Sequence, residues 1–101
     1  MEQMKMESFC NCTPIFHALG DPARQRIILM LVDKERLSVN EIAEQSTLSR
    51  PAISHHLKVL REAGLVHIEQ KGTQRFYSLS MEDAIGKLKA LVQAVEHACE
   101  K

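Results

Sequence analysis

Three cysteines carry the most reactive side chains of this 101-residue sequence: a single residue separates Cys10 from Cys12, and Cys99 lies near the other end. Two thiolates cannot fill a four-coordinate metal site, so the Cys-x-Cys pair alone is a weak motif. Three thiolates would suit a thiophilic metal or metalloid ion, such as arsenite, antimonite, cadmium, lead or mercury. The same thiols could instead form a disulfide or polysulfide bridge. They could also be inert, with Cys99 a small buried hydrophobe and the pair in a frayed terminus.

A second set of functional side chains is basic. Residues 48–80 carry five Lys or Arg against two Glu, although the formal net charge of the whole chain is zero. Arg50, Ser54, Lys58 and Arg61 recur at steps of four, four and three, which places them on one face of a helix, opposite its apolar residues. Phosphate contacts to a nucleic acid need such a local positive surface. The alternative is an ordinary solvated helix face.

Helix start and stop signals surround these residues. A cap residue followed by proline predicts helices that begin at Pro14 and at Pro22. The sequence SVNE at 38–41 is a capping box that opens a short third helix, and Ser49 caps a fourth helix that ends at Gly64. Because about three residues join the third and fourth helices, the pattern predicts a helix-turn-helix.

The period changes after the fourth helix. Two extended runs, 65–71 and 74–79, flank Gly72-Thr73, which predicts a β-hairpin with a type II′ turn. Ser80 marks the cap of a last helix, whose apolar residues follow the i, i+3, i+4, i+7 pattern. Gly86 inside that helix has no evident reason except the close approach of another helix.

The predicted fold is mainly α with a small β-hairpin, in the order ααααββα: a winged helix-turn-helix. A chain of 101 residues is the size of one domain. We assign residues 14–101 to the winged helix-turn-helix domain with its C-terminal helix. Residues 1–13 form an N-terminal extension that carries the Cys-x-Cys pair.

On this fold the basic residues fall on the parts of a helix-turn-helix that meet DNA. Early positions of a recognition helix reach base edges, which assigns base contacts to its first residues. Lys58 suits a phosphate contact, and the hairpin turn would reach the neighbouring minor groove or backbone. The predicted DNA-binding residues are Ser49, Arg50, Pro51, Ser54, His55, Lys58, Lys71, Thr73, Gln74 and Arg75.

The two adjacent histidines, His55 and His56, lie on different faces of the predicted recognition helix. His56 follows Ile53 by three residues and precedes Leu60 by four, so it borders the apolar face. We therefore expect His56 to be a hydrogen-bonded structural histidine, whereas His55 lies nearer the polar face.

Other classes of protein are disfavoured. The longest apolar run, IILMLV at 27–32, is far short of the roughly 20 residues that span a membrane. The first residues mix acids and bases without an apolar stretch, unlike a signal peptide. We therefore expect a cytoplasmic protein. No nucleophile–base pair or phosphate-binding glycine loop indicates an enzyme.

Two segments, HALGDPARQRIILML and SVNEIAEQSTLSRPAISHHLKVLREAGLVHIEQKGTQRFYSL, resemble the ArsR/SmtB-type family of small winged-helix repressors. The most telling stretch is SRPAISHHLKVLREAGLV, which carries the S-x-H-L-x-x-L-x-x-x-G-L-V part of that family's signature. The resemblance covers roughly residues 14–98.

The resemblance implies a homodimeric repressor that is released from its operator by an inducer, often a metal ion. Its first and last helices would form the dimer interface, through Ile15, Phe16, Leu88, Leu91, Val92 and Val95. Two recognition helices would then meet successive major grooves about 34 Å apart on a pseudo-palindromic DNA operator.

Two recurrent metal sites of the family are not retained. Ser38 and Asn40 stand where one site has two cysteines, and Met81 and Ala94 replace two of the four ligands of another site, on the last helix. The second loss disfavours zinc.

The implied packing of the first helix against the last would bring Cys10 and Cys12 within reach of Cys99, in one protomer or across two. We therefore predict a repressor released by a thiophilic ion bound to these thiolates. The alternatives are a redox- or polysulfide-responsive repressor of the same fold, and a winged-helix protein-interaction module that does not bind DNA.

Overall fold

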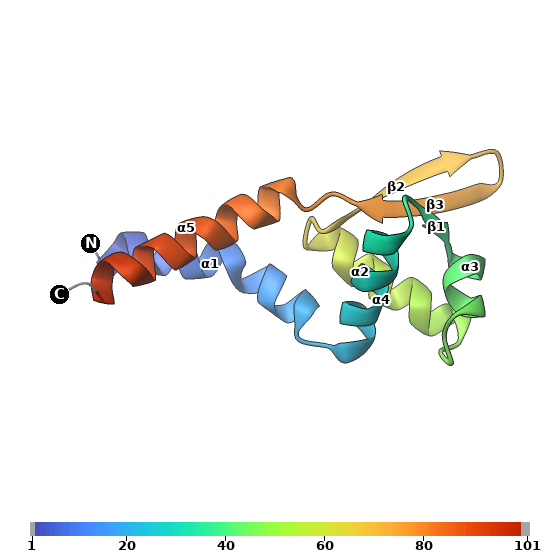
Figure 1. Ribbon diagram of the computed structural model, residues 1–101, viewed down its shortest axis with the longest axis horizontal. Coiled ribbons are helices and arrows are strands. Elements are labelled where there is room, and N and C mark those ends of the chain that lie inside the picture. The colour runs from blue at the N-terminus through green and yellow to red at the C-terminus, as the bar shows by residue number, and fades with distance from the viewer. Residues whose placement is uncertain (1, 100–101) are drawn as a thin grey trace.

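The computed structural model describes residues 2–99, and the side chains of residues 6–99. In order, the elements are α1 (Glu2–Leu19), α2 (Pro22–Asp33), β1 (Leu37–Ser38), α3 (Val39–Glu44), α4 (Arg50–Glu62), β2 (Val66–Lys71), β3 (Gln74–Leu79) and α5 (Glu82–Cys99). Figure 1 shows α1 and α5 side by side as an arm that projects from a rounded unit made of the other elements. The molecule is correspondingly elongated, 53 × 25 × 21 Å.

Three helices begin at the caps that the sequence predicts. Asp21 Oδ1 accepts a 2.7 Å hydrogen bond from the backbone N–H of Ala23 at the start of α2. Ser38 and Glu41 form the expected reciprocal capping box of α3, over 2.9 and 3.2 Å. Ser49 caps α4. These local signals hold because each cap satisfies N–H groups that the first turn of a helix leaves without partners.

The predicted start of the first helix at Pro14 is wrong, because α1 is continuous from Glu2 to Leu19 with the proline inside it. Thr13 does not cap a helix; its hydroxyl donates to the backbone carbonyl of Phe9 over 3.0 Å. A proline inside a helix costs roughly 3 kcal/mol. Packing against α5 offsets that cost, since Cys12 and Ile15, on either side of Pro14, are buried.

The hairpin has the predicted turn and one unpredicted neighbour. Gly72 has φ of 62° and, in the described chain, no residue other than glycine has a positive φ, as a type II′ turn at Gly72-Thr73 requires. The short strand β1 adds to β3 in the order β1-β3-β2, with Leu37 opposite Tyr77. A two-residue strand shows no alternation, so the sequence pattern could not reveal it.

The last helix begins later than predicted. Ile85 N–H bonds the carbonyl of Met81, so α5 starts at Glu82, and Ser80 instead donates its N–H to Leu65 over 3.0 Å. Gly86 lies in open space, since a Cβ there would meet nothing within 4 Å. Within this chain it therefore does not mark a close approach between helices.

The core lies mostly in the rounded unit, with three members contributed by α1 and α5, and it orients α4. Its fully buried members include Ile42 of α3, Ile53, Leu57 and Leu60 of α4, and Leu65 before β2. The three α4 residues lie on one face of that helix, which fixes its rotation. The opposite face of α4 consequently points to solvent.

Candidate nucleic-acid interface

All ten residues predicted to contact DNA are exposed. Six of them, Ser49, Arg50, Pro51, Ser54, His55 and Lys58, lie at the cap or on the first nine residues of α4. The other four, Lys71, Thr73, Gln74 and Arg75, surround the turn of the β2–β3 hairpin. The structure thus places them on two neighbouring elements: the recognition helix α4, and the β2–β3 hairpin, which forms the wing of the fold.

A concave surface joins these two elements. It encloses about 200 Å³ and is lined by Ser54, Lys58 and Arg61 of α4 and by Ile68, Arg75 and Tyr77 of the hairpin. Three of these side chains are cations and none is an anion. Guanidinium and ammonium groups on an open concave surface suit the phosphate oxygens of a nucleic-acid backbone.

Arg61 is a residue that the predicted DNA-binding set omits. It lies near the C-terminal end of α4, beyond the positions expected to read bases, yet it lines the same concave surface as Arg75. Arg61 follows Lys58 by three residues on the same polar stripe, and this spacing could have added it to the predicted DNA-binding set. What the sequence pattern could not show is how close the hairpin lies to that end of the helix.

The two basic residues of the hairpin, Lys71 and Arg75, differ in how freely they can bind a phosphate. Lys71 Nζ lies 3.7 Å from Glu69 Oε1 on the same strand, and both side chains are about half exposed. A surface pair of this kind is weak and screened by salt, so a phosphate can replace the carboxylate at small cost. Arg75 is the cation that faces α4 across the concave surface.

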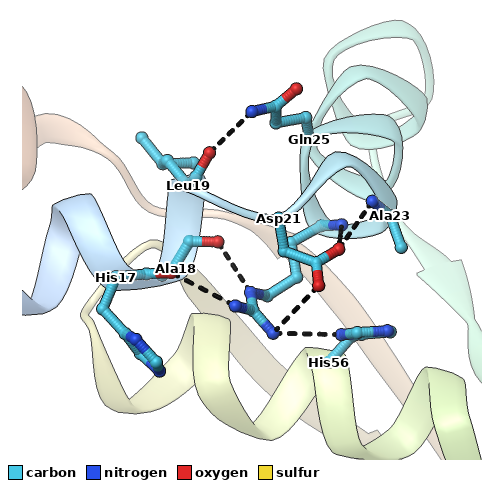
Figure 2. A network of polar contacts seen from close by, with 8 residues as sticks. His17, Ala18, Leu19, Asp21, Ala23, Gln25 and His56 are labelled. Atoms are coloured by element: carbon cyan, nitrogen blue, oxygen red, sulfur yellow. Dashed lines mark hydrogen bonds and ion pairs between the residues drawn. The ribbon is translucent and has the colours of Figure 1, made fainter.

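His56 has the structural role that its position predicts. Its Nδ1 lies 3.2 Å from Nη1 of Arg24, a buried arginine on α2 (Figure 2). His55, the preceding residue, is exposed, and the two imidazole rings are tilted with their centroids 5.9 Å apart. Arg24 is a second residue that sequence reasoning missed; its spacing of three and four residues before Ile27 and Ile28 placed it on the buried face of α2.

The carboxyl group of Asp21 belongs to the same network. The backbone N–H of Ala23 donates to it, and this hydrogen bond is the main reason why the pKa of Asp21 is lowered. The N–H of Arg24 and the positive charge of its guanidinium, whose Nη1 lies 3.9 Å from Oδ2, act in the same direction. Asp21 is thus held ionised at the start of α2, where the helix dipole also stabilises a negative charge.

The three cysteines do not meet within one chain. Cys10 and Cys12 are two residues apart on α1, so they project from different sides of the helix: Cys10 is exposed, and Cys12 is 0% exposed. Cys12 lies level with Lys87 of α5, because its thiol donates to that residue's carbonyl over 3.4 Å. Cys99 lies twelve residues further along α5, roughly 18 Å at 1.5 Å per residue.

The described residues also offer no alternative cluster of metal ligands. Among the residues that the structure describes, no three His, Cys, Asp or Glu side chains are grouped so that they could hold a metal ion. The three-thiolate site expected from the sequence therefore does not fit a single protomer. Cys10 and Cys99 are exposed on the two helices of the arm.

The arm presents an apolar surface to solvent. Of the six residues predicted to form a dimer interface, Phe16, Val92 and Val95 are exposed and Leu88 is partly buried. Ile15 and Leu91 are only 2% and 8% exposed, because they pack inside the chain itself. Further exposed apolar side chains on the same two helices are Met6, Phe9 and Ile85.

The fold and the exposed basic surface of α4 and the hairpin define a winged helix-turn-helix DNA-binding protein. Residues 21–67 match the sequence model of a family described as bacterial regulatory protein, arsR family. The chain is 34% identical over 87 residues to an uncharacterized HTH-type transcriptional regulator of Methanocaldococcus jannaschii, covering 86% of this chain and 97% of the relative. It is 32% identical over 88 residues to the arsenical resistance operon repressor of Bacillus subtilis, covering 87% and 84%.

A solved structure, reduced HlyU from Vibrio cholerae, superposes with a TM-score of 0.72 at 30% identity, covering 93% of this chain and 97% of that one. The chain therefore belongs to the ArsR family of transcriptional regulators. These relatives are regulators and not enzymes. In the described part of the chain, no helix is long and apolar enough to cross a membrane.

Proposed function

We propose that this chain is a sequence-specific repressor that binds a pseudo-palindromic operator as a homodimer. The single observation that carries the proposal is the concave basic surface between α4 and the hairpin, lined by Lys58, Arg61 and Arg75. A helix that lies in the major groove is flanked by phosphates of the DNA backbone. Cations beside the helix bind these phosphates and so position the helix in the groove. Arg50, Pro51, Ser54 and His55, on the first turns of α4, then contact base edges.

Binding of the wing complements that of the helix. Lys71, Thr73, Gln74 and Arg75 surround the hairpin turn and are exposed. We assign them to the neighbouring backbone or minor groove, together with the phosphate contact of Lys58. Ser49 caps α4 through Ala52 N–H over 3.3 Å and leaves its own backbone N–H at the helix start for a phosphate.

The DNA-binding proposal is tested by fluorescence anisotropy with the chain's own promoter fragment at 50 and 200 mM salt. Arg50→Ala and Lys58→Ala should each weaken binding by about tenfold. Lys87→Ala removes one positive charge from α5, on the arm, and is the matched control. Unchanged affinity in Arg50→Ala and Lys58→Ala would refute the assignment of α4. Salt-independent binding, or none, would favour a protein-interaction module instead.

The homodimer rests on the apolar surface of the arm. Phe16 on α1, and Val92 and Val95 on α5, are 46%, 54% and 42% exposed. Several large apolar side chains exposed along one arm are typical of a surface that another protein chain covers. A hollow of about 360 Å³ on α5, lined in part by Ile85 and Val92, suits an apolar side chain of a second copy. Val92→Glu should yield monomers in sedimentation and lower operator affinity strongly, since each half-site alone binds weakly.

We further propose that a thiophilic metal or metalloid ion is the inducer. Two observations support this: exposed thiols at Cys10 and Cys99 on the arm, and a relative that is named an arsenical resistance operon repressor. Because one chain does not bring three thiolates together, the ligands would have to come from two protomers. Cys12 could join only if α1 separated from α5 around its buried thiol.

Release from DNA on titration with arsenite, cadmium, lead and zinc tests this inducer. Cys10→Ser and Cys99→Ser should each abolish release by a thiophilic ion. Mixed dimers of these two variants should regain about half of the response, because one shared site is rebuilt across the interface. Full release in the Cys10→Ser/Cys99→Ser double variant would refute the proposal.

A thiol oxidation sensor is the second candidate, favoured by the exposure of the same two thiols. Here an oxidant or a polysulfide would join Cys10 and Cys99 of two protomers and change the dimer geometry. Release by diamide or polysulfide, with a covalent dimer on a non-reducing gel and no response to arsenite, would select this mechanism.

A further inference from the structure

Arg24, near the start of α2, is a buried cation that is 8% exposed. Its Nε donates to the carbonyl of Ala18 over 2.7 Å, and its Nη2 donates to the carbonyl of His17 over 3.1 Å. Both carbonyls belong to the last turn of α1, which leaves them without a partner inside the helix. The carbonyl of His17 accepts a second, long hydrogen bond of 3.4 Å from the N–H of Gly20. The guanidinium therefore caps the negative end of the α1 dipole.

A neighbouring side chain completes the cap. Gln25 Nε2 donates to the carbonyl of Leu19 over 2.7 Å. Side chains at two successive positions of α2 thus hold three successive carbonyls of α1, as Figure 2 shows. The corner between α1 and α2 is consequently fixed by side chains as well as by the chain connection, and the two helices should move as one body.

The same guanidinium reaches the recognition helix. Its Nη1 lies 3.2 Å from Nδ1 of His56 on α4. Arginine has only donors, so Nδ1 must accept, and the imidazole must be neutral with its proton on Nε2. One residue of α2 therefore joins the end of α1 to the middle of α4.

We propose that Arg24 is a positioning residue that, through His56, sets the angle between the arm and the recognition helix and passes movements of α1 to the DNA-contacting face. The proposal rests on the DNA-binding function proposed above. The proposal follows from geometry. Helix α1 lies in the arm, α4 carries the predicted base contacts, and the guanidinium of Arg24 contacts both helices. A change in dimer geometry that moves the end of α1 must either move α4 or break these bonds.

Protonation of His56 should break this link. A protonated imidazole donates from both nitrogens, so Nδ1 and Nη1 of Arg24 would become two facing cationic donors. Two other titratable groups lie beside the ring: the carboxylate of Asp21, which attracts both cations, and the imidazole of His55, with its ring centroid 5.9 Å away. A fall in pH is therefore an experimental means of breaking this contact, and operator affinity should weaken with it.

The first test uses the unmodified protein. Imidazole ¹⁵N shifts of the free homodimer at pH 8 should show His56 with an unprotonated Nδ1 and a proton on Nε2. The opposite tautomer, or a charged ring at pH 8, would overturn the proposal, whatever the substituted variants do.

The second test compares operator affinities from pH 8 to pH 5.5 at constant salt. His56→Asn keeps an acceptor near the position of Nδ1 but cannot be protonated. The ratio of the wild-type dissociation constant to that of His56→Asn should rise about tenfold as the pH falls. Effects of other histidines cancel in this ratio. His67→Asn, at an exposed position of β2, is the matched control and should show no rise.

Arg24→Lys keeps the charge but loses the planar fork, and should weaken operator binding about tenfold at pH 8 while the dimer stays folded. A flat affinity ratio for His56→Asn, with wild-type binding intact, would overturn the positioning role alone. Absence of salt-dependent binding by the wild type would overturn the proposed DNA-binding function instead. The two failures are therefore distinguishable.

Discussion

The thiol of Cys12 on α1 donates a hydrogen bond to the backbone carbonyl of Lys87 on α5, and its side chain is fully buried between the two helices. A cysteine that is a candidate sensor by its type is thus a packing residue of the arm by its position. Cys10, two residues earlier, and Cys99, at the end of α5, are exposed. The three thiols should differ in reactivity accordingly.

Thiol labelling of the native, reduced protein should show two classes. Cys10 and Cys99 should react rapidly with a thiol reagent, whereas Cys12 should react only when the arm opens or the chain unfolds. The measurement is the time course of labelling with and without denaturant, followed by mass spectrometry of peptides. Cys12→Ala should leave the fast phase unchanged, and rapid modification of Cys12 in the native state would contradict its burial.

Gly86→Ala should stabilise the protein. Alanine in the middle of a helix is favoured over glycine by roughly 1 kcal/mol, and a Cβ at this position meets no atom within 4 Å in the chain. Urea unfolding of the two proteins at equal concentration measures the gain. Loss of stability together with weaker dimerisation would show instead that a second copy approaches the helix at this glycine.

Arg61→Ala should weaken operator binding by a similar factor for all sequences and lower the slope of log affinity against log salt by about 1. The reason is that Arg61 lines the basic concave surface but lies past the base-reading turns of α4. Binding titrations at several salt concentrations provide the slope, with Lys87→Ala as the control. A change in base preference without a change in slope would mean that Arg61 contacts a base edge.

Asp21→Asn should remove part of the acid sensitivity of folding. The pKa of Asp21 is lowered in the folded state, so the unfolded chain binds the proton more tightly. Its contribution to stability is therefore present above its ordinary pKa, near 4, and is lost as the pH falls through the lower folded pKa. Urea unfolding at pH 7 and pH 3.5 should show the wild type more stable at pH 7 and the difference smaller at pH 3.5. An equal difference at both pH values would contradict this assignment.

Local signals predicted most of the fold. The caps at Asp21, Ser38 and Ser49 and the turn at Gly72 act within a few residues, so the sequence states them directly. The start of α1 was mispredicted for the same reason: Thr13-Pro14 is a good local start signal, and only contacts with α5, some 70 residues away, overrule it. Strand β1 was missed because it exists only through pairing with β3.

The candidate DNA surface was largely readable, because its residues lie on one helix face and one turn. Their exposure follows from the apolar stripe on the other side of α4. Arg61 and Arg24 were missed because their roles depend on elements distant in the sequence: the hairpin beside the end of α4, and the carbonyls at the end of α1. His56 was placed correctly, but its partner could not be named.

The sequence by itself determined the helices with their caps, the hairpin and the outward basic stripe, since periodicity and capping are short-range properties of the chain. Only the tertiary structure decided what the cysteines can do. Burial against α5 removes Cys12 from solvent, and the length of α5 separates it from Cys99. Spacing along a sequence specifies which side chains share a helix face, but the distance between two helices, and the level at which they meet, is set by packing.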